Sequence, residues 1–293
     1  MAWSGTGLIW TLSGGVLTSR AFGGTPRAET PSEFSFVQIS DSHIGFKKPV
    51  NSDVTATLQI AVDKVSALSR CPDFVIHTGD LTHSSREAEF DTLEQVLKGM
   101  KVPAVFYVPG EHDTAVDEGK QYLARYGKGT HGRGWYSFDY KGAHFIGLVN
   151  VGAVDGLGKL GADQIAWLKK NLHGRSASTP IVIFAHIPLW AVYHEWGWET
   201  QDAAEALRCV KRFGSVTVLN GHIHQVLQKT EGNVSFHTGM STAFPQPAPG
   251  AAPSPGPMKV PSERLRDLLG IAKVQVFKGS HSLAVVDSSL SAA

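Results

Sequence analysis

Seven side chains of the kinds that bind metal ions recur along the 293-residue chain, each at or just beyond the end of a short apolar run. They are Asp41, His43, Asp80, Glu111, His186, His222 and His224. Carboxylate oxygens mixed with imidazole nitrogens suit zinc, manganese or iron in their divalent range. The pattern therefore predicts a transition-metal site assembled from distant parts of the sequence.

The runs that precede these side chains have the composition of buried strands. They are short and rich in β-branched and aromatic residues, and they read FSFVQIS, DFVIHT, AVFYVP, IVIFA and SVTVLN. Open α/β sheets bind ligands beyond the carboxyl ends of their strands. We therefore expect five strands of one sheet to deliver the Asp and His side chains to a single edge.

The metal-type residues also fall into short motifs that follow one another in a fixed order. The motifs are Asp41-Ser42-His43, Gly79-Asp80, Gly110-Glu111-His112-Asp113, His186 and Gly221-His222-Ile223-His224. This ordered set resembles the calcineurin-like metallophosphoesterase superfamily, and most of all its bacterial branch that includes class III cyclic nucleotide phosphodiesterases. The resemblance extends from about Phe34 to at least Gly239. It implies an α/β fold, a four-layer α/β/β/α sandwich with two mixed sheets and a binuclear metal site at the strand C-terminal edge.

The resemblance further implies two divalent or mixed-valence transition-metal ions, Mn, Fe or Zn, and a ligand set for each. The first ion would be held by Asp41, His43, Asp80 and His224. Asp80 would bridge to the second ion, whose other ligands would be Glu111, His186 and His222. Two ions ~3.5–4 Å apart clamp the attacking and leaving oxygens of an in-line displacement at phosphorus. The implied activity is phosphodiester hydrolysis, with cyclic nucleotides as leading substrates, by attack of a metal-bridging hydroxide.

His112 and Asp113 are the predicted catalytic residues. In the family this histidine points into the cleft, off the metals, where it contacts the phosphoryl group or protonates the leaving oxygen. Asp113 is expected to accept a hydrogen bond from one ring nitrogen of His112, which would fix the tautomer and favour the charged imidazole. A charged imidazole is a good general acid toward an alkoxide. The alternative is that His112 is a structural turn histidine.

Glu111 stands where the family usually has asparagine. If it ligates the second ion, the site gains one negative charge, the ions become weaker Lewis acids and the pH optimum moves upward. The added charge would also favour a more highly charged ion such as Fe(III). If instead the longer side chain overshoots, the second site is weak.

Three further features leave alternatives open. His83, three residues after Asp80, is expected to support the site, to face the substrate or to belong to a plain surface loop. The segment 190–198 holds Trp190, Tyr193, Trp196 and Trp198, and it forms either a rim that encloses the organic part of a substrate or a local apolar cluster or dimer contact. The proline-rich segment 245–261 must lie at the surface, as a solvated linker or as a flap that shapes the substrate cleft.

Composition limits the remaining possibilities. The formal net charge is +1, so nothing predicts a nucleic-acid partner, and no apolar run is long enough for stable membrane insertion. The two cysteines, Cys71 and Cys209, do not form a disulfide framework and are interpreted as ordinary half-buried thiols. The expected partner is a small phosphoester substrate, and a homo-oligomer is compatible with the sequence.

Residues 1–30 lie outside the motif pattern. They resemble an export signal that lacks its charged start, or else they form a disordered tail. The first interpretation predicts a periplasmic or exported protein, and the second leaves a cytoplasmic one open. Residues 31–293 are predicted to form one metallophosphoesterase domain, in which segments 53–69, 84–97 and 162–172 are helical. Three late or central hairpins are expected near residues 141, 232 and 279, the last two as a second sheet.

Two other functions compete with phosphodiester hydrolysis. One is a phosphomonoesterase, which would use the same metals and the same attack. The other is a scaffold that keeps the fold for partner binding without catalysis. Asp41, Asp80, His112 and His222 are all present and favour an enzyme, whereas Glu111 is the only departure that favours the scaffold.

Overall fold

The computed structural model describes residues 8–13, 16–21, 33–152, 157–277 and 283–291. Strands β1 (Leu8–Ser13) and β2 (Val16–Ala21) pair antiparallel as a small sheet of their own. The sequence analysis expected no strands in this segment. The export signal proposed for residues 1–30 stays a prediction, and most of that segment lies outside the described residues. Helices of the described chain are all too short or too polar to cross a membrane.

The first of two large sheets has the strand order β13-β12-β3-β4-β5. Its strands are β3 (Phe34–Ile39), β4 (Phe74–His77), β5 (Val105–Tyr107), β12 (Gly270–Val276) and β13 (Ala284–Ser289). Strands β3, β4 and β5 run parallel, whereas β12 is antiparallel to both of its neighbours. The sheet is therefore mixed, as predicted.

The second large sheet has the order β10-β11-β9-β8-β7-β6. Its strands are β6 (Tyr136–Tyr140), β7 (Ala143–Gly147), β8 (Ile181–Phe184), β9 (Val216–Asn220), β10 (Gln228–Glu231) and β11 (Val234–Thr238). The four inner strands are parallel and the two edge strands are antiparallel to them. This sheet is also mixed.

Two expectations about strand partnership are wrong. The five motif strands do not share one sheet, because β3, β4 and β5 lie in the first sheet while β8 and β9 lie in the second. The late hairpins do not form a sheet together either, since β10 and β11 extend the second sheet and β12 and β13 extend the first. Both pairs are edge hairpins, and periodicity cannot show which existing sheet an edge hairpin joins.

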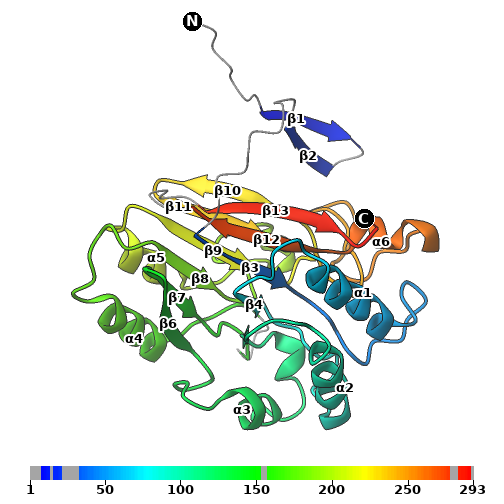
Figure 1. The fold of residues 1–293 in the computed structure, drawn as a ribbon, viewed down its shortest axis with the longest axis horizontal. Coiled ribbons are helices and arrows are strands. Elements are labelled where there is room, and N and C mark those ends of the chain that lie inside the picture. The colour runs from blue at the N-terminus through cyan, green and yellow to red at the C-terminus, as the bar shows by residue number, and fades with distance from the viewer. Residues whose placement is uncertain (1–7, 14–15, 22–32, 153–156, 278–282, 292–293) are drawn as a thin grey trace, which may run out of the picture.

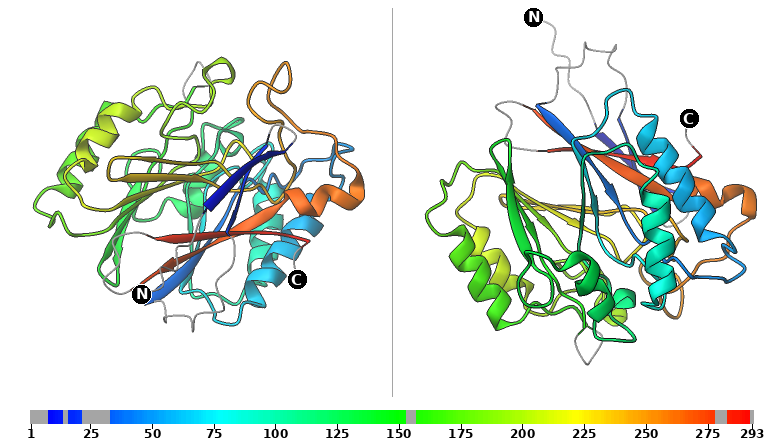
Figure 2. Two further views of the ribbon diagram at one scale, coloured as in Figure 1. Left: turned by 90° about the horizontal axis from the view of Figure 1, so that it is seen from above. Right: turned by 60° about the horizontal axis from the view of Figure 1, so that its bottom comes forward.

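Helices cover the outer face of each sheet (Figure 2). Helices α1 (Val54–Ser66) and α2 (Glu87–Leu97) pack on the first sheet, where Leu58 and Leu93 meet Val37 and Val75 in one buried cluster. Helices α4 (Ala162–Leu172) and α5 (Ala203–Val210) pack on the second sheet, with Leu168 and Val210 against Ile183 and Val218. The three predicted helices are confirmed, each to within a few residues. The shorter helices are α3 (Lys120–Tyr126) and α6 (Leu265–Leu268).

A third buried cluster lies between the sheets. It is dominated by aromatic rings, with Phe36 stacked on Phe74 at a centroid distance of 5.1 Å and Phe145 edge-on to both. Strand β3 illustrates the alternation, because Phe34 and Phe36 enter this cluster while Val37 and Ile39 face the helices. Together these layers make the predicted α/β/β/α sandwich, and the two sheets end side by side at the edge that carries the motifs (Figure 1).

Candidate metal centre

The seven predicted metal ligands come together at the carboxyl ends of five strands drawn from both sheets. Asp41 and His43 follow β3, Asp80 follows β4, and Glu111 begins a short 3₁₀ turn (Glu111–Asp113) after β5. From the second sheet, His186 follows β8, and the pair His222 and His224 follows β9. Side chains separated by up to 183 residues are thereby placed around one point.

The first group of atoms surrounds Nε2 of His43. This nitrogen lies 3.3 Å from Nε2 of His224 and 3.3 Å from Oδ2 of Asp80. Oδ1 of Asp41 lies 3.3 Å from the same His224 nitrogen. All four side chains are almost fully buried. They are the four residues that the resemblance assigns to the first ion.

The second group surrounds Nε2 of His186. Oε2 of Glu111 lies 2.9 Å from this nitrogen, and Oε1 of the same carboxylate lies 3.0 Å from Nδ1 of His222. Oδ2 of Asp80 lies 3.5 Å from Nε2 of His186. One oxygen of Asp80 therefore faces both groups, which is the position of a bridging carboxylate.

These spacings fit ligands around transition-metal ions. A tetrahedral ion with ligands at about 2.1 Å places those ligands about 3.4 Å apart, and octahedral neighbours about 3.0 Å apart. The first group, at 3.3 Å throughout, matches the tetrahedral value. The second group, between 2.9 and 3.5 Å, spans both values. Glu111 thus reaches the second group rather than overshooting it.

Missing hydrogen bonds provide an independent indication of a bound cation. Oε2 of Glu111, Nε2 of His186 and Nδ1 of His222 are buried, and none of them has a hydrogen-bond partner of acceptable geometry. Buried polar atoms are nearly always paired, so three unpaired ones that converge need an explanation. A metal ion between them would satisfy all three, and the residues present therefore fit the metals that the family pattern implies.

The outward-facing nitrogens of two ligand histidines are held by backbone carbonyl groups. Nδ1 of His186 donates to the carbonyl oxygen of Thr78 at 2.8 Å, and Nδ1 of His224 donates to that of Phe244 at 2.6 Å. A proton held on Nδ1 leaves the Nε2 lone pair free for an ion, and the bond also fixes the plane of the ring. Sequence reasoning missed both partners, because a backbone carbonyl has no sequence pattern.

The ligand loops adopt a strained backbone. Eight non-glycine residues of the described chain have positive φ, and five of them are proposed ligands: Asp41, His43, Asp80, His222 and His224. The left-handed conformation costs a non-glycine residue on the order of 1–2 kcal/mol and persists where the surrounding structure enforces it. Here it turns the chain sharply at each strand end, so that both ligands of one short loop reach the cluster.

The motif glycines allow the loops to approach one another closely. A Cβ atom on Gly110 would lie 2.0 Å from Oδ1 of Asp80, and one on Gly221 would lie 2.1 Å from Oγ of Ser40. A Cβ on Gly79, whose φ is +98°, would lie 2.5 Å from Nδ1 of His186. Any larger residue would displace a proposed ligand or its neighbour, which explains the glycine before Asp80, Glu111 and His222 in physical terms.

Burial and neighbouring charges shift the pKa values of the clustered side chains in different directions. Burial opposes ionisation of Asp41, but the neighbouring His224 and His186 lower its pKa to about 2. Burial likewise opposes the charge on Glu111, yet His222 and His186 bring its pKa well below the usual value. The pKa of His186 is raised well above its usual value, because Asp80 and Glu111 outweigh the cost of burial. The pKa of His43 is lowered by burial and by three neighbouring histidines, so this ring is neutral.

His112 lies beside the cluster, but the prediction that Asp113 accepts a hydrogen bond from its ring is wrong. Nδ1 of His112 donates to the backbone carbonyl of His83 at 2.7 Å, not to Asp113. The Asp113 carboxylate instead accepts from the backbone amides of Gly110, Leu81 and Thr82 at 2.8 to 3.0 Å, which ties the Glu111 turn to the loop after Asp80. Adjacent residues of a 3₁₀ turn project in different directions, so the two side chains diverge. Asp113 is therefore a positioning residue.

The electrostatic expectation for His112 agrees with the structure even so. Burial disfavours the charged imidazole, but Asp80, Glu111 and the His83 carbonyl raise the pKa of His112. Burial, together with the charge of Asp80, raises the pKa of Asp113 to about 7. The raised pKa favours the charged form of the His112 ring.

A cavity of about 470 Å³ opens over the two groups. Its lining includes His43, Asp80, Glu111, His112, His222 and His224. Trp196 and Trp198 from the aromatic segment and Pro255 and Pro257 from the proline-rich segment also line it. His83 also lines the cavity, half-buried, so it belongs to the site and not to a plain surface loop.

The aromatic segment 190–198 and the proline-rich segment 245–261 both contribute residues to the lining of this cavity. Trp198 is buried and packs edge-on against Trp196 at 4.9 Å, so the segment is a local cluster and a rim at once. Gln246 fastens the proline-rich segment, because its Nε2 donates to the carbonyl of His222 at 2.8 Å and its Oε1 accepts from the amide of Gly256 at 3.0 Å. The proline-rich segment therefore shapes the cleft as a fixed loop.

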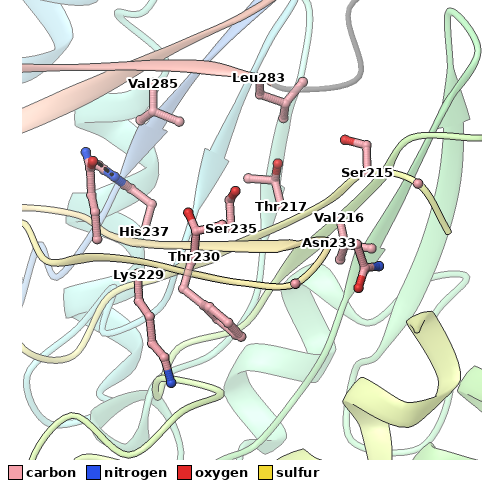
Figure 3. Close-up of a pocket in the computed structure, with 14 residues that line it drawn as sticks. Ser215, Val216, Thr217, Lys229, Thr230, Asn233, Ser235, His237, Leu283 and Val285 are labelled. Atoms are coloured by element: carbon pink, nitrogen blue, oxygen red, sulfur yellow. Dashed lines mark hydrogen bonds between the residues drawn. The ribbon is translucent and has the colours of Figure 1, made fainter. Parts of the chain in front are cut away.

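A second cavity, of about 490 Å³, lies away from the metal-type cluster between β13 and strands β9 to β11 (Figure 3). Hydroxyl groups of Thr217, Thr230 and Ser235 line it on one side and Leu283 and Val285 on the other. The imidazole of His237 at its end is fully engaged, with Asp287 at 3.0 Å and Gln228 at 3.2 Å. No free nucleophile or base of the described residues marks it as a catalytic site.

Comparison with known proteins now decides the family. A family model described as calcineurin-like phosphoesterase matches residues 34–226, which include every proposed ligand. The chain belongs to this family. Membership supports a metal-dependent phosphoester hydrolase, in agreement with the sequence analysis.

Two of the relatives that match this chain have names that state a probable activity. A protein of Arcobacter nitrofigilis, named "Probable glycerophosphodiester phosphodiesterase GpdQ", is 27% identical over 167 residues, which cover 52% of this chain and 56% of the relative. A "Probable cyclic nucleotide phosphodiesterase" of Vesicomyosocius okutanii is 25% identical over 218 residues, covering 72% and 87%. The first match thus spans little more than half of that relative.

Solved structures of low sequence identity share the fold. A dimetal phosphatase from Danio rerio superposes with a TM-score of 0.63 at 14% identity, covering 89% of this chain and 97% of that one. A purple acid phosphatase from yellow lupin gives 0.63 at 16% identity, covering 94% and 57%. These likenesses show that the layered fold of this chain is shared with solved structures over most of its length.

Proposed function

We propose that this protein hydrolyses small phosphodiesters at a centre of two transition-metal ions. One observation carries the proposal: two groups of carboxylate and imidazole atoms share Asp80, and three of their buried atoms have no hydrogen-bond partner. Asp41, His43 and His224 would hold the first ion, and Glu111, His186 and His222 the second. Asp80 would bind both. Manganese, iron and zinc all suit this mixture of oxygen and nitrogen donors.

A pair of bound divalent ions lowers the pKa of water and neutralises charge that develops on phosphoryl oxygens. The chain itself contributes orientation and a proton. The amide of His112 donates to Oδ1 of Asp80 at 3.0 Å, which holds the bridging carboxylate in one orientation. The imidazole of His112 lines the cavity with a raised pKa, and we assign it the role of general acid toward the leaving oxygen.

The wall of the cavity indicates which ester is preferred. Trp196, Trp198, Pro255 and Pro257 supply apolar surface in the same cavity as the proposed ligands, where an organic group would be shielded from water. A diester carries two organic groups, one of which leaves while the other can rest against this wall. Two family relatives with diesterase names support the same choice over a monoester, and cyclic nucleotides and glycerophosphodiesters are the first substrates to test.

The proposal is tested with metal-free protein reconstituted with Mn(II), Zn(II) or Fe(II). Hydrolysis of bis(p-nitrophenyl) phosphate, p-nitrophenyl phosphate, 3′,5′-cyclic AMP and glycerophosphocholine should be compared at equal enzyme concentration. Faster hydrolysis of the diesters, with two ions bound per chain, is expected. Preference for the monoester would replace the diesterase assignment, and two bound ions without hydrolysis of any ester would favour a scaffold. Asp63→Ala on the exposed face of α1 is the matched control for Asp substitutions.

A further inference from the structure

The three ligand histidines with a partner for Nδ1 do not use the same kind of partner. His186 and His224 donate to the backbone carbonyls of Thr78 and Phe244. His43 instead has a side chain opposite its Nδ1, the imidazole of His83, with the two Nδ1 atoms 3.3 Å apart. A backbone carbonyl can only accept, whereas an imidazole nitrogen accepts only when it carries no proton.

The direction of the His43–His83 hydrogen bond follows from which ring nitrogens carry protons. Nε2 of His43 faces the first group of ligand atoms and must offer its lone pair to an ion, so the single proton of the neutral ring is on Nδ1. That proton can be donated only if Nδ1 of His83 is the acceptor. The proton of His83 is then on Nε2, which fixes the tautomer of both rings.

The surrounding structure holds the His83 ring where this bond needs it. The ring stacks on that of His112 at a centroid distance of 4.6 Å and an interplanar angle of 18°. Phe46 packs edge-on against it at 5.2 Å, and the backbone amide of His83 donates to the carbonyl of Ile44 at 2.9 Å. Rotation of the ring away from His43 would break contacts on two sides.

The backbone of His83 makes a second contact within the site, in addition to that of its side chain with His43. Its carbonyl oxygen accepts the hydrogen bond from Nδ1 of His112 at 2.7 Å. The side chain thus contacts a proposed ligand of the first ion, and the main chain contacts the proposed acid. Both contacts start from one residue, three positions after the bridging Asp80.

We infer that His83 is a positioning residue of this centre: its Nδ1 lone pair fixes His43 for the first ion, while its carbonyl group orients His112. The inference rests on the proposed two-metal function. The two contacts can be tested separately, because substitution of the His83 side chain removes the contact with His43 and leaves the carbonyl that contacts His112 in place. Loss of the partner of a ligand histidine typically lowers metal affinity by about 10–100-fold.

The test compares His83→Phe with His83→Asn. Phenylalanine keeps the ring that packs on His112 and Phe46 but has no acceptor, whereas the asparagine Oδ1 atom can occupy the place of Nδ1 and accept from His43. Stepwise Co(II) titration, followed by the visible absorption of the bound ion, reports each site without any turnover. The first-site affinity should fall about 10–100-fold in His83→Phe and return to within a few-fold of wild type in His83→Asn.

The contact between the His83 carbonyl and His112 is tested by a separate measurement, the dependence of the rate on the leaving group. In both variants the ratio of rates toward a poor and a good leaving group should match that of wild type, because the carbonyl that orients His112 remains. Unchanged first-site affinity in His83→Phe, or equal losses in both variants, would overturn the inference while two Co(II) ions still bind wild-type protein. If wild-type protein itself fails to bind two ions, the proposed function is what fails. Circular dichroism of both variants excludes a general loss of folding.

Discussion

The Glu111 carboxylate reaches the two histidines of the second group at once, with Oε2 2.9 Å from Nε2 of His186 and Oε1 3.0 Å from Nδ1 of His222. The side chain is 39% exposed, yet Oε2 is buried and lacks a hydrogen-bond partner. The resemblance implies a neutral asparagine at this position, whereas this chain places a carboxylate there. Its extra charge is directed at the second ion position.

Replacing Glu111 with asparagine should shift the pH dependence of the rate. The substitution removes one negative charge, so less ligand charge offsets the two cations, and the acidic limb of the rate–pH profile should move to lower pH. Two ions should remain bound. The measurement is the profile for a nitrophenyl diester together with metal content on the same preparation.

Removing the carboxylate altogether separates ligation from electrostatics. Glu111→Ala should lose the second ion in preference to the first, since only His186, His222 and Asp80 would remain to hold it. Full occupancy in this variant, combined with an unmoved profile in the asparagine variant, would refute ligation by Glu111. Asp63→Ala, on the exposed side of α1, is the control for handling losses.

Because Asp80 lies at the bridging position, its substitution should affect both metal ions rather than one. Its Oδ2 atom lies 3.3 Å from Nε2 of His43 and 3.5 Å from Nε2 of His186, so it faces both groups. Asp80→Ala should therefore reduce the affinity for both ions and abolish hydrolysis, with the fold retained by circular dichroism. Elemental analysis that finds two ions per chain in this variant would contradict the bridging role.

Metal binding should release protons, chiefly at the second site. Asp80 and Glu111 raise the pKa of His186 well above its usual value, so the metal-free ring is protonated at neutral pH and must lose its proton to bind an ion. His43 is neutral already, because burial lowers its pKa. The affinity of the second site should thus fall more steeply than that of the first as the pH is lowered.

Calorimetric titration in buffers of different ionisation enthalpy measures this release. We expect about one more proton released for the second ion than for the first near pH 7. Equal release at both sites would show that His186 is not the group that titrates.

The sequence predicted the metal-type cluster better than its surroundings. Every one of the seven ligand-type residues reaches the cluster, because the motifs combine side-chain chemistry with a strand end that fixes direction. The outer helices were also predictable from their periodicity. These features depend on local pattern, which a single sequence contains.

Features set by tertiary contact were out of reach. Strand periodicity places β8 and β9 in a sheet but does not say which one, so the division of the motif strands between two sheets was missed. The partner of His112 was assigned to the neighbouring Asp113, whereas the real acceptor is a carbonyl 29 residues away. Backbone acceptors such as those of Thr78, His83 and Phe244 leave no trace in the side-chain sequence.

The role of His112 as an acid can be measured through the leaving group. His112→Ala should slow esters with poor leaving groups by about 10²–10⁴-fold, because an alkoxide needs a proton as it departs. Nitrophenyl esters, which leave as stable anions, should be affected much less. Equal losses for both kinds of ester, with both ions retained, would assign His112 to phosphate positioning instead. His173→Ala, an exposed histidine after α4, is the matched control.

A final prediction concerns a contact that joins the two sheets far from the metal-type cluster. The Asp73 carboxylate accepts from the backbone amide of Ser35, in β3 of the first sheet, at 3.0 Å. It also accepts from the hydroxyl of Tyr140 at 2.7 Å and from Nζ of Lys141 at 2.8 Å, at the β6–β7 turn of the second sheet. Burial opposes its charge, but these three donors lower the pKa of Asp73 below its ordinary value of 3.8.

Asp73→Asn should therefore destabilise the protein at neutral pH, by about 1–3 kcal/mol if the charged hydrogen bonds have their usual strength. A carboxylate whose folded-state pKa is depressed contributes stability that is complete above its unfolded pKa and is lost as the pH falls through the lower, folded value. The difference between wild type and Asp73→Asn should persist from pH 7 to about pH 5 and shrink as the pH falls below 3.8. Urea denaturation across this range measures it, and a difference that grows toward low pH would contradict the assignment.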